Sequence, residues 1–423
     1  MNLRLESAGT RMKNVILWVT GSGLLFPLFF QLSGKIYSSA EPVWDSGGMI
    51  TRLPLPVSLP VCCGALLLLA AHHRRAALAL KVVAAMALTM VVSLMLAGPA
   101  IESRKVILLL QVLLPMTGLV LGQMIEDESQ ILPRAFLGVL TILVPAQLLA
   151  GWVRGNPWLT HDLYFFSIYQ HFQFVPLILV CGFAYAMSRL WDTHKATFYI
   201  LTPLMLIYTF ESLSFLTIFA FVAFLGAFTL VRPEGRKAKR RAILLVAVAI
   251  AGLLVHLAIL KNVAGMENSV AGQYAGKFQT MERGETPRNV QDRLGDWKLY
   301  GTGIVESGRT FLLGHPAPFP REVKTSAHNW YLDVAYNFGV IALLPVVFLI
   351  GYTSYLLRQG REALPAATCW LAAIVFYLVL VDSNMKVTLR QPYPGIFAYF
   401  LWGMLLSSLT RAHREGKDSE RRA

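Results

Sequence analysis

The sequence has 423 residues, of which 55% are hydrophobic and only 15% are charged, and its formal net charge is +14. Soluble domains carry roughly 25% charged residues, so this composition excludes an ordinary soluble protein and favours an integral membrane protein. The positive charge has to be explained by where the basic residues fall along the chain.

Apolar runs close to 20 residues long recur along the chain, and a helix of that length crosses a hydrocarbon core about 30 Å thick. Barrel strands are shorter and alternate in polarity, so these runs predict helices. We expect an all-α membrane protein with about twelve transmembrane helices, nine within residues 1–260 and three within 335–410. The runs are 14–33, 54–71, 77–97, 105–123, 133–153, 171–189, 196–211, 213–231, 242–260, 336–357, 364–382 and 393–410.

The basic residues are distributed unevenly between the two sides of the membrane. With the N-terminus inside, 21 of the 38 Lys and Arg residues fall in segments on the inner side. Such an excess is typical of cytoplasmic segments. It predicts that both termini, including the basic tail 411–423, are cytoplasmic. The net charge therefore indicates membrane topology, and nucleic acid is not expected as a partner.

One long polar stretch, residues 261–334, interrupts the apolar pattern. Nine preceding spans place it on the outer side, which is the periplasm in a bacterium, and long loops cross the membrane largely regardless of their charge. We expect the chemistry of the protein to reside in this loop. All four cysteines fall in predicted spans, so neither a disulfide framework nor a metal cluster is expected.

The loop is expected to contain two helices separated by a break. Helical spacing is tolerable over 262–283, residues 284–287 carry Gly and Pro, and a second helix is predicted over 288–300. Arg293 and Trp297 then share one helical face. Further along, Ser326 is expected to cap the helix that enters the membrane near residue 336, with His328 in its first turn.

His328 is the candidate catalytic residue. A neutral imidazole accepts a proton from a hydroxyl nucleophile, and general base catalysis contributes roughly 10²- to 10⁴-fold. The alternative is a histidine that caps or anchors a helix at the membrane interface. Its neighbours Asn329 and Tyr331, and the outward-facing cations, favour the catalytic interpretation.

Basic residues on the outer side suggest a phosphate-binding site, because guanidinium groups bind phosphate oxygens in a bidentate manner. Contact with lipid headgroups is the alternative explanation for any one of them. Arg293 is the first candidate because of its spacing to Trp297, and Arg390 is the second. The remaining candidates are Arg288, Arg309 and Lys386.

Polar residues near the outer ends of other spans are weaker candidates. Glu211 and His171 are expected to line a cavity, although capping and interfacial anchoring explain them almost as well. A near match to a phosphate-binding loop at 303–310 is discounted, since it has Arg where Lys belongs and no preceding strand. Asp292, Asp296 and Asp333 are too scattered to indicate a metal site, so we expect metal-independent chemistry without a cofactor.

The order of these features resembles that of the O-antigen ligase and polymerase superfamily of bacterial envelope glycosyltransferases. The matching segments are Arg293-x-x-x-Trp297, Phe311-Leu312-Leu313-Gly314, His328-Asn329-x-Tyr331-Leu332 and Gly339. Two departures stand out. Gly314-His315-Pro316 lacks a second family glycine, and Ser212-Leu213-Ser214 stands where many members carry a Ser-Arg pair.

The resemblance implies transfer of a glycan from an undecaprenyl-diphosphate carrier to a sugar hydroxyl of lipid A-core, at the periplasmic face of the bacterial inner membrane. His328 would activate or orient that hydroxyl. Arg293 and Arg390, with Arg288 and Lys386, would hold the diphosphate. The residues expected to support the site are Trp297, Asn329, Tyr331, His171 and Glu211.

Three other functions stay open. A polymerase would use the same residues with a different acceptor, and the short outer loop 154–170 favours a ligase because polymerases tend to have two sizeable outer loops. A lipid-linked glycan transporter would show repeats and midplane charges, which the sequence does not show clearly. A scaffold would tolerate loss of both His328 and Arg293.

Overall fold

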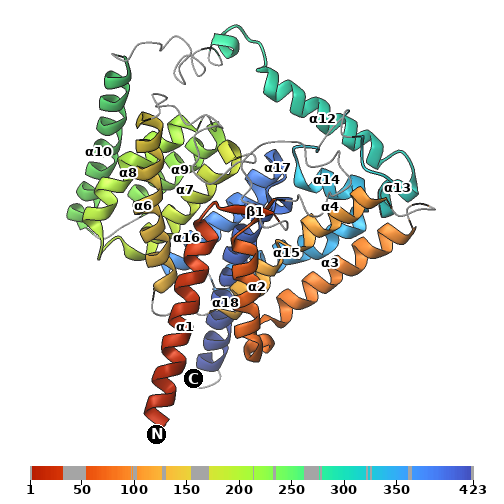
Figure 1. Ribbon diagram of the computed structural model, residues 1–423, viewed down its shortest axis with the longest axis horizontal. Helices are drawn as coiled ribbons and strands as arrows, with labels where there is room; N and C mark the ends of the chain where they lie inside the picture. The colour runs from red at the N-terminus through yellow and green to blue at the C-terminus, as the bar shows by residue number, and fades with distance from the viewer. Residues whose placement is uncertain are drawn as a thin grey trace. The chain divides into compact units, whose positions relative to one another are not determined.

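The computed structural model describes residues 2–31, 54–96, 98, 102–125, 130–153, 171–212, 214–231, 235–261, 276, 279–320, 323, 326–360 and 364–420 (Figure 1). The described residues are 85% helical, which confirms the all-α prediction. The outer loops predicted at 34–53 and 154–170 lie outside the described residues.

The chain divides into two compact units. The first comprises residues 1–58 and 127–285, and the second comprises 59–126 and 286–423. Elements of the first unit are α1 (Asn2–Leu25), β1 (Phe29–Gln31), β2 (Pro54–Pro56), α6 (Ile131–Val153), α7 (His171–Leu190), α8 (Lys195–Glu211), α9 (Phe215–Val231) and α10 (Gly235–Lys261). The two strands pair in antiparallel fashion, with Phe29 opposite Pro56.

The second unit holds His328 and the motif segments. Its elements begin with α2 (Ser58–Leu68), η1 (Ala70–Ala76), α3 (Ala77–Leu96), α4 (Ser103–Leu113), α5 (Thr117–Met124), α12 (Arg288–Ile304), α13 (Gly308–Leu313) and α14 (Trp330–Phe338). They continue with η3 (Val340–Leu343), α15 (Leu344–Gly360), α16 (Ala366–Phe376), the π-helical η4 (Tyr377–Asp382), α17 (Ser383–Met385), η5 (Thr388–Arg390) and α18 (Pro392–Glu420).

Six helical segments among the described residues are long and apolar enough to cross a membrane. They are 70–96, 103–124, 131–151, 242–259, 340–360 and 366–385, and shorter apolar helices occupy 58–68, 174–190 and 215–230. These segments coincide with runs predicted from the sequence, and they are what a multi-pass membrane protein requires. The total of twelve spans stays a prediction.

A close contact between α5 and α18 forms the centre of the second unit. Gly118 and Gly122 are four residues apart on α5, the spacing that lets membrane helices approach at their backbones. A Cβ atom added to Gly122 would lie 2.1 Å from the carbonyl oxygen of Phe400, and one added to Gly118 would lie 2.3 Å from that of Ile396. The two helices can therefore pack this closely only with glycine at these positions.

Replacing Gly122 with alanine is expected to destabilise the protein by roughly 1–3 kcal/mol, because the new methyl group must push α5 and α18 apart. Thermal unfolding of the detergent-purified protein measures the loss. Gly351→Ala is the matched control, since nothing lies within 4 Å of a Cβ atom there. Equal unfolding temperatures for the two variants would contradict this account of the helix contact.

Candidate active site

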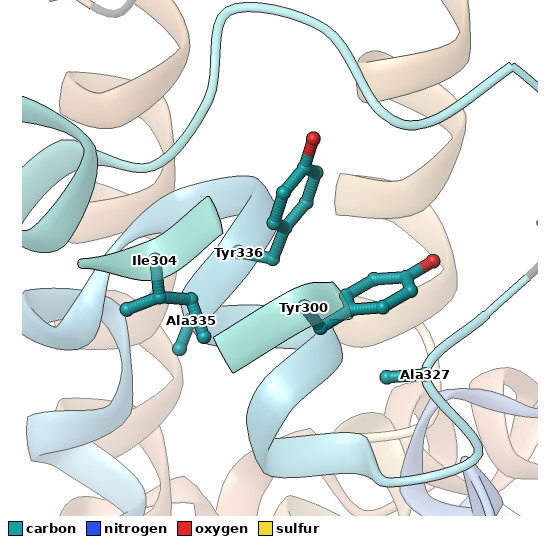
Figure 2. Packing of buried hydrophobic residues seen from close by; sticks show 5 residues of the cluster. All are labelled: Tyr300, Ile304, Ala327, Ala335 and Tyr336. Atoms are coloured by element: carbon teal, nitrogen blue, oxygen red, sulfur yellow. The ribbon is translucent and has the colours of Figure 1, made fainter. Parts of the chain in front are cut away.

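Helix α12 presents one face to the rest of its unit. Tyr300 and Ile304 of this face pack against Ala335 and Tyr336 of α14 and against Ala327 in the segment before α14, and all five are buried (Figure 2). The rings of Tyr300 and Tyr336 meet edge to face with centroids 5.0 Å apart. This packing holds the preceding turns of α12, which carry Arg293, Asp296 and Trp297, beside the His328 segment.

His328 is held by a carboxylate from α12. Its Nδ1 atom lies 3.0 Å from Oδ2 of Asp296, and Asp296 is buried while 40% of the His328 side chain is exposed. In the neutral imidazole this contact puts the ring proton on Nδ1 and leaves the lone pair on Nε2, because a carboxylate only accepts hydrogen bonds. The pair therefore orients the imidazole and leaves Nε2 outside the contact with Asp296.

The backbone of His328 is in the left-handed region, with φ +49°. This conformation costs a residue with a side chain roughly 1–2 kcal/mol. A chain retains such strain where the surroundings enforce it, and binding and catalytic sites are where it clusters. The conformation of His328 is thus consistent with a site residue that aims its ring at Asp296.

The predicted start of the helix after His328 was wrong. Asn329, not Ser326, is the N-cap, and its Oδ1 atom accepts hydrogen bonds from the backbone N–H groups of Tyr331 (2.9 Å) and Leu332 (3.1 Å). His328 therefore precedes the helix instead of lying in its first turn. The helix is also separate from the membrane span, because α14 ends at Gly339 and the span begins at residue 340.

Asn329 and Tyr331 tie this helix to the segment at 377–385. The Asn329 side-chain amide donates to Oδ1 of Asn384 (3.2 Å), and the Tyr331 hydroxyl donates to the Val379 carbonyl (2.8 Å). Val379 lies in the π-helical η4, a rare form that is frequent at functional sites. Asn329 and Tyr331, both predicted as supporting residues, thus fix the backbone next to His328.

Two of the predicted diphosphate-binding cations already have carboxylate partners. Arg390 forms an ion pair with Asp333 at 2.5 Å, and Lys386 lies 3.3 Å from Asp382. All four side chains are buried, and Asp382 also accepts a hydrogen bond from Thr388. In each pair the two charges neutralise one another, and the Arg390–Asp333 pair links α14 to η5.

Arg293 is in a different position. It is half-buried, and burial lowers the pKa of its guanidinium group while attraction to Asp382 opposes that shift. Its guanidinium makes no hydrogen bond or ion pair with the described residues, apart from this attraction. Arg288, at the first turn of α12, is exposed. Arg293 is therefore the predicted cation whose donors are most available for an anion beside His328.

Trp297 follows Arg293 by one helical turn, as predicted. Its indole Nε1 atom is buried and has no acceptor among the described residues. An indole N–H is a donor only, and it usually finds a partner when it is buried. Trp297 thus has an unsatisfied donor one helical turn from Arg293.

The two motif glycines, Gly314 and Gly339, lie where the segment after α13 contacts the end of α14. Gly314 and Gly339 both have φ near +80°, at +76° and +80°. A Cβ atom on Gly339 would lie 2.0 Å from the Leu312 carbonyl oxygen, and one on Gly314 would lie 2.5 Å from the backbone nitrogen of Phe338. The Phe311–Gly314 segment therefore packs backbone to backbone against the end of α14.

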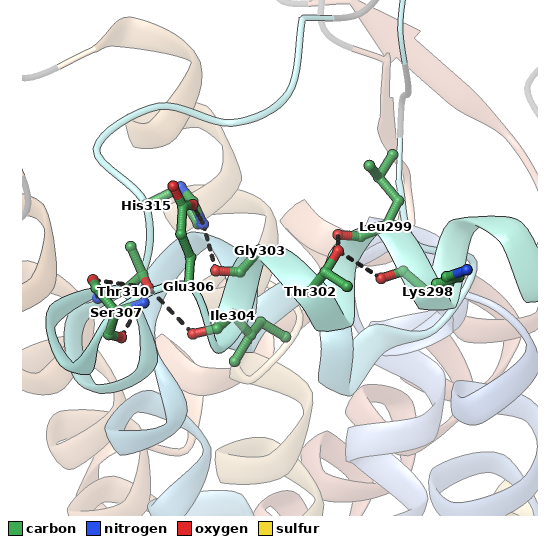
Figure 3. Close-up of polar contacts among 9 residues, drawn as sticks. All are labelled: Lys298, Leu299, Thr302, Gly303, Ile304, Glu306, Ser307, Thr310 and His315. Carbon is green, nitrogen blue, oxygen red and sulfur yellow. Dashed lines mark hydrogen bonds and ion pairs between the residues drawn. The ribbon is translucent and has the colours of Figure 1, made fainter.

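His315 fastens the end of α12. Its backbone N–H donates to the Tyr336 carbonyl (2.8 Å), its Nε2 atom lies 2.9 Å from the Gly303 carbonyl oxygen, and its ring stacks on Tyr336 (Figure 3). Buried Lys105 of α4 donates to the His315 carbonyl at 2.8 Å. These contacts hold the end of α12 on α14.

The near match to a phosphate-binding loop at 303–310 is not built as one. Its residues form the end of α12 and the start of α13, where Ser307 and Thr310 make a reciprocal capping box (Figure 3). Helix α12, and not a strand, leads into it, and the Gly303 carbonyl accepts a hydrogen bond from His315. We retain the interpretation of this segment as structural.

Glu211 belongs to the first unit. Its Oε1 atom lies 2.5 Å from Nε2 of His256 on α10, and both side chains are buried. His171 is the first residue of α7, and its side chain lies outside the described residues. That Glu211 and His171 line one cavity stays a prediction.

Sequence reasoning missed the acidic partners of the site. Asp296 and Asp333 were dismissed as scattered, yet Asp296 holds His328 and Asp333 holds Arg390. Helical spacing contained a signal for Asp296, which lies three residues after Arg293 and four before Tyr300 on the inward face of α12. Asp382 and Asn384 carried no such signal, because their roles depend on the π-helical segment. No group of three or more possible metal-binding side chains occurs among the described residues.

Replacing Asp296 with asparagine is expected to lower the turnover of the protein's reaction by roughly 10- to 100-fold, the usual cost of losing a partner that orients a histidine. An amide no longer requires the proton on Nδ1, so the ring is free to adopt the wrong tautomer. The effect should fall on kcat more than on KM. Asp292→Asn, on the exposed side of α12, is the control and should be close to wild type.

No protein-family model matches this sequence, and no curated protein matches it significantly. The fold and the site by themselves define a class: an all-α protein with several helices of membrane-spanning length and a histidine–aspartate pair beside buried ion pairs.

Proposed function

We propose that this protein is an O-antigen ligase-like glycosyltransferase. It moves a glycan from an undecaprenyl-diphosphate carrier to a sugar hydroxyl of lipid A-core, without a metal ion, on the periplasmic face of the bacterial inner membrane. The observation that carries the proposal is the His328–Asp296 pair, which leaves the second imidazole nitrogen available and in which Asp296 follows Arg293 by three residues on α12.

In this reaction the acceptor hydroxyl oxygen attacks the anomeric carbon of the donor while the bond from that carbon to the diphosphate oxygen breaks. Nε2 of His328 takes the hydroxyl proton as the new bond forms. Negative charge develops on the departing carrier diphosphate, and Arg293 stabilises it from a site already partly shielded from water. A single displacement of this kind inverts the configuration at the anomeric carbon.

The proposal assigns different roles to the four predicted cations. Arg293 binds the diphosphate directly, because its donors are not committed to another side chain in the described part of the protein. Arg288 lies five residues earlier on α12 and is exposed. Arg390 and Lys386, each paired with a carboxylate, hold the neighbouring backbone in position.

Topology supports the same proposal. The twelve spans and cytoplasmic termini that the sequence predicts would put residues 261–334 in the periplasm, where lipid-linked glycans and lipid A-core meet. The motif segments of this loop are brought together by packing of α12 and α13 on α14. An arrangement of this kind suits two substrates that are both anchored in the leaflet.

Arg293→Lys is expected to weaken binding of the carrier diphosphate about tenfold or more, because lysine keeps the charge but loses the bidentate geometry, and hydrogen bonds to charged groups are worth roughly 1.5–3 kcal/mol. Binding of undecaprenyl-diphosphate glycan to purified protein in nanodiscs measures the loss. Arg288→Lys is the matched control on the same helix. Equal affinity in the two variants would remove Arg293 from the donor site.

A polymerase of the same superfamily is the second candidate, because the described site does not distinguish the acceptor. Purified protein is given labelled donor with and without lipid A-core, in the presence of a chelator. A ligase forms product only with lipid A-core, whereas a polymerase lengthens the glycan on the carrier alone. Movement of donor without any transfer would instead support a transporter and would contradict the proposal.

A further inference from the structure

A patch of exposed apolar side chains lies at the junction of α13 and α3. Val305, Phe311 and Leu312 are 68%, 42% and 46% exposed, although they belong to the polar loop and to none of the candidate spans. Met95 and Leu96, the last residues of α3, are exposed as well. An apolar patch on a polar segment indicates contact with a partner or a membrane.

The two helices are joined directly at this junction. The Ser93 hydroxyl donates to the Leu313 carbonyl, and Arg309 of α13 donates to the Leu96 carbonyl at 2.5 Å. Arg309 thereby satisfies a carbonyl group at the end of α3, where the helix leaves such groups without intrahelical partners. The short helix is thus seated on the last turn of α3.

The apolar patch continues the outward face of a candidate membrane span. Helix α3 belongs to the segment 70–96, only 28% of whose apolar window is buried within the protein. Leu88 and Val91 are among its exposed side chains. A spanning helix with so little protein cover presents that face to lipid, and the same apolar surface extends past Leu96 onto α13.

We propose that α13 is a membrane-interface anchor, with Phe311, Leu312 and Val305 inserted among the acyl chains at the outer edge of the leaflet. Arg309 is exposed and lies at the level of the headgroups, where its remaining N–H donors reach lipid phosphates while its stem covers apolar surface. The capping box fixes the start of α13 next to the end of α12, and the close backbone contacts at Gly314 and Gly339 join α13 to α14. The anchor therefore sets the height of both helices above the membrane.

Any site in this unit that acts on lipid-borne groups has to lie close to the membrane surface, and the anchor meets this requirement. Asp296 and Arg293 lie on the same helix that ends just before α13. Fixing α13 in the headgroup layer therefore keeps these side chains near groups attached to lipids. The proposal itself requires no particular reaction, because it depends only on α3 spanning the membrane.

Depth-dependent fluorescence quenching tests the anchor. Cys63 and Cys369, the exposed cysteines among the free ones, are replaced by alanine, and Leu312→Cys is labelled with an environment-sensitive fluorophore in phospholipid nanodiscs. Two lipid nitroxides are used, one near the headgroup and one near the chain end. Leu88→Cys in the middle of α3 and Lys298→Cys on the exposed side of α12 are the controls.

The label at 312 should be quenched most by the shallow nitroxide, the label at 88 most by the deep nitroxide, and the label at 298 by neither. The proposal is overturned if neither nitroxide quenches the label at 312. This holds whether the emission of the label indicates exposure to water or burial against a second protein. If Leu312→Cys does not purify as a folded protein, Val305→Cys provides the same measurement. No donor or acceptor is needed, so failure here leaves the proposed glycosyltransferase activity to its own tests.

Discussion

Replacing His328 with alanine is expected to lower the rate constant of glycan transfer by roughly 10²- to 10⁴-fold, the usual contribution of a general base. Donor binding should change little, because the diphosphate is held by Arg293 rather than by the imidazole. Single-turnover transfer and donor binding, measured on the same preparations, separate the two effects.

The control for this variant is His413→Ala, which removes a histidine from the C-terminal part of α18. It should transfer glycan at the wild-type rate. Alanine keeps a Cβ atom and therefore does not relieve the left-handed backbone at residue 328, so the unfolding temperature of His328→Ala is measured alongside transfer. Unchanged transfer by His328→Ala would remove this residue from the chemistry.

Arg390→Ala is expected to destabilise the protein by roughly 3–5 kcal/mol, the usual cost of leaving one member of a buried ion pair without its partner. Asp333 is 3% exposed, so water cannot replace the lost guanidinium. Removing both charges together, as Arg390→Met with Asp333→Asn, should recover much of the loss. Chemical or thermal unfolding in nanodiscs measures all three proteins.

Arg288→Ala is the control for this prediction, because Arg288 is exposed and no described carboxylate depends on it. Its unfolding should match that of the wild type. If Arg390→Ala instead unfolds like the wild type but fails to bind the donor, Arg390 contacts the diphosphate directly, and the role assigned to it as the partner of Asp333 is wrong.

The sequence predicted the helical membrane scaffold well, because span length and polarity are local properties of the chain. The break at 284–287 and the helix carrying Arg293 and Trp297 were also predicted, since Gly and Pro mark helix ends. The predicted N-cap of the helix after His328 was three residues too early, because Ser326 and Asn329 are both good N-cap residues and only tertiary contacts choose between them.

What the sequence could not show was how distant acidic residues would be paired. The contact between Asp296 and His328 joins residues 32 positions apart, and that between Asp333 and Arg390 joins residues 57 apart. Periodicity places each residue on a face of its own helix but does not specify which helix that face meets. The same limit applies to Lys105, whose partner His315 is 210 positions away.

The measurement that tests the central claim most directly is a double-mutant comparison of His328 and Asp296 in single-turnover glycan transfer to lipid A-core. If the two side chains act as one base, the protein carrying both His328→Ala and Asp296→Asn will be no slower than His328→Ala alone. Losses that multiply, or wild-type transfer by His328→Ala, would contradict the claim that Asp296 acts through His328.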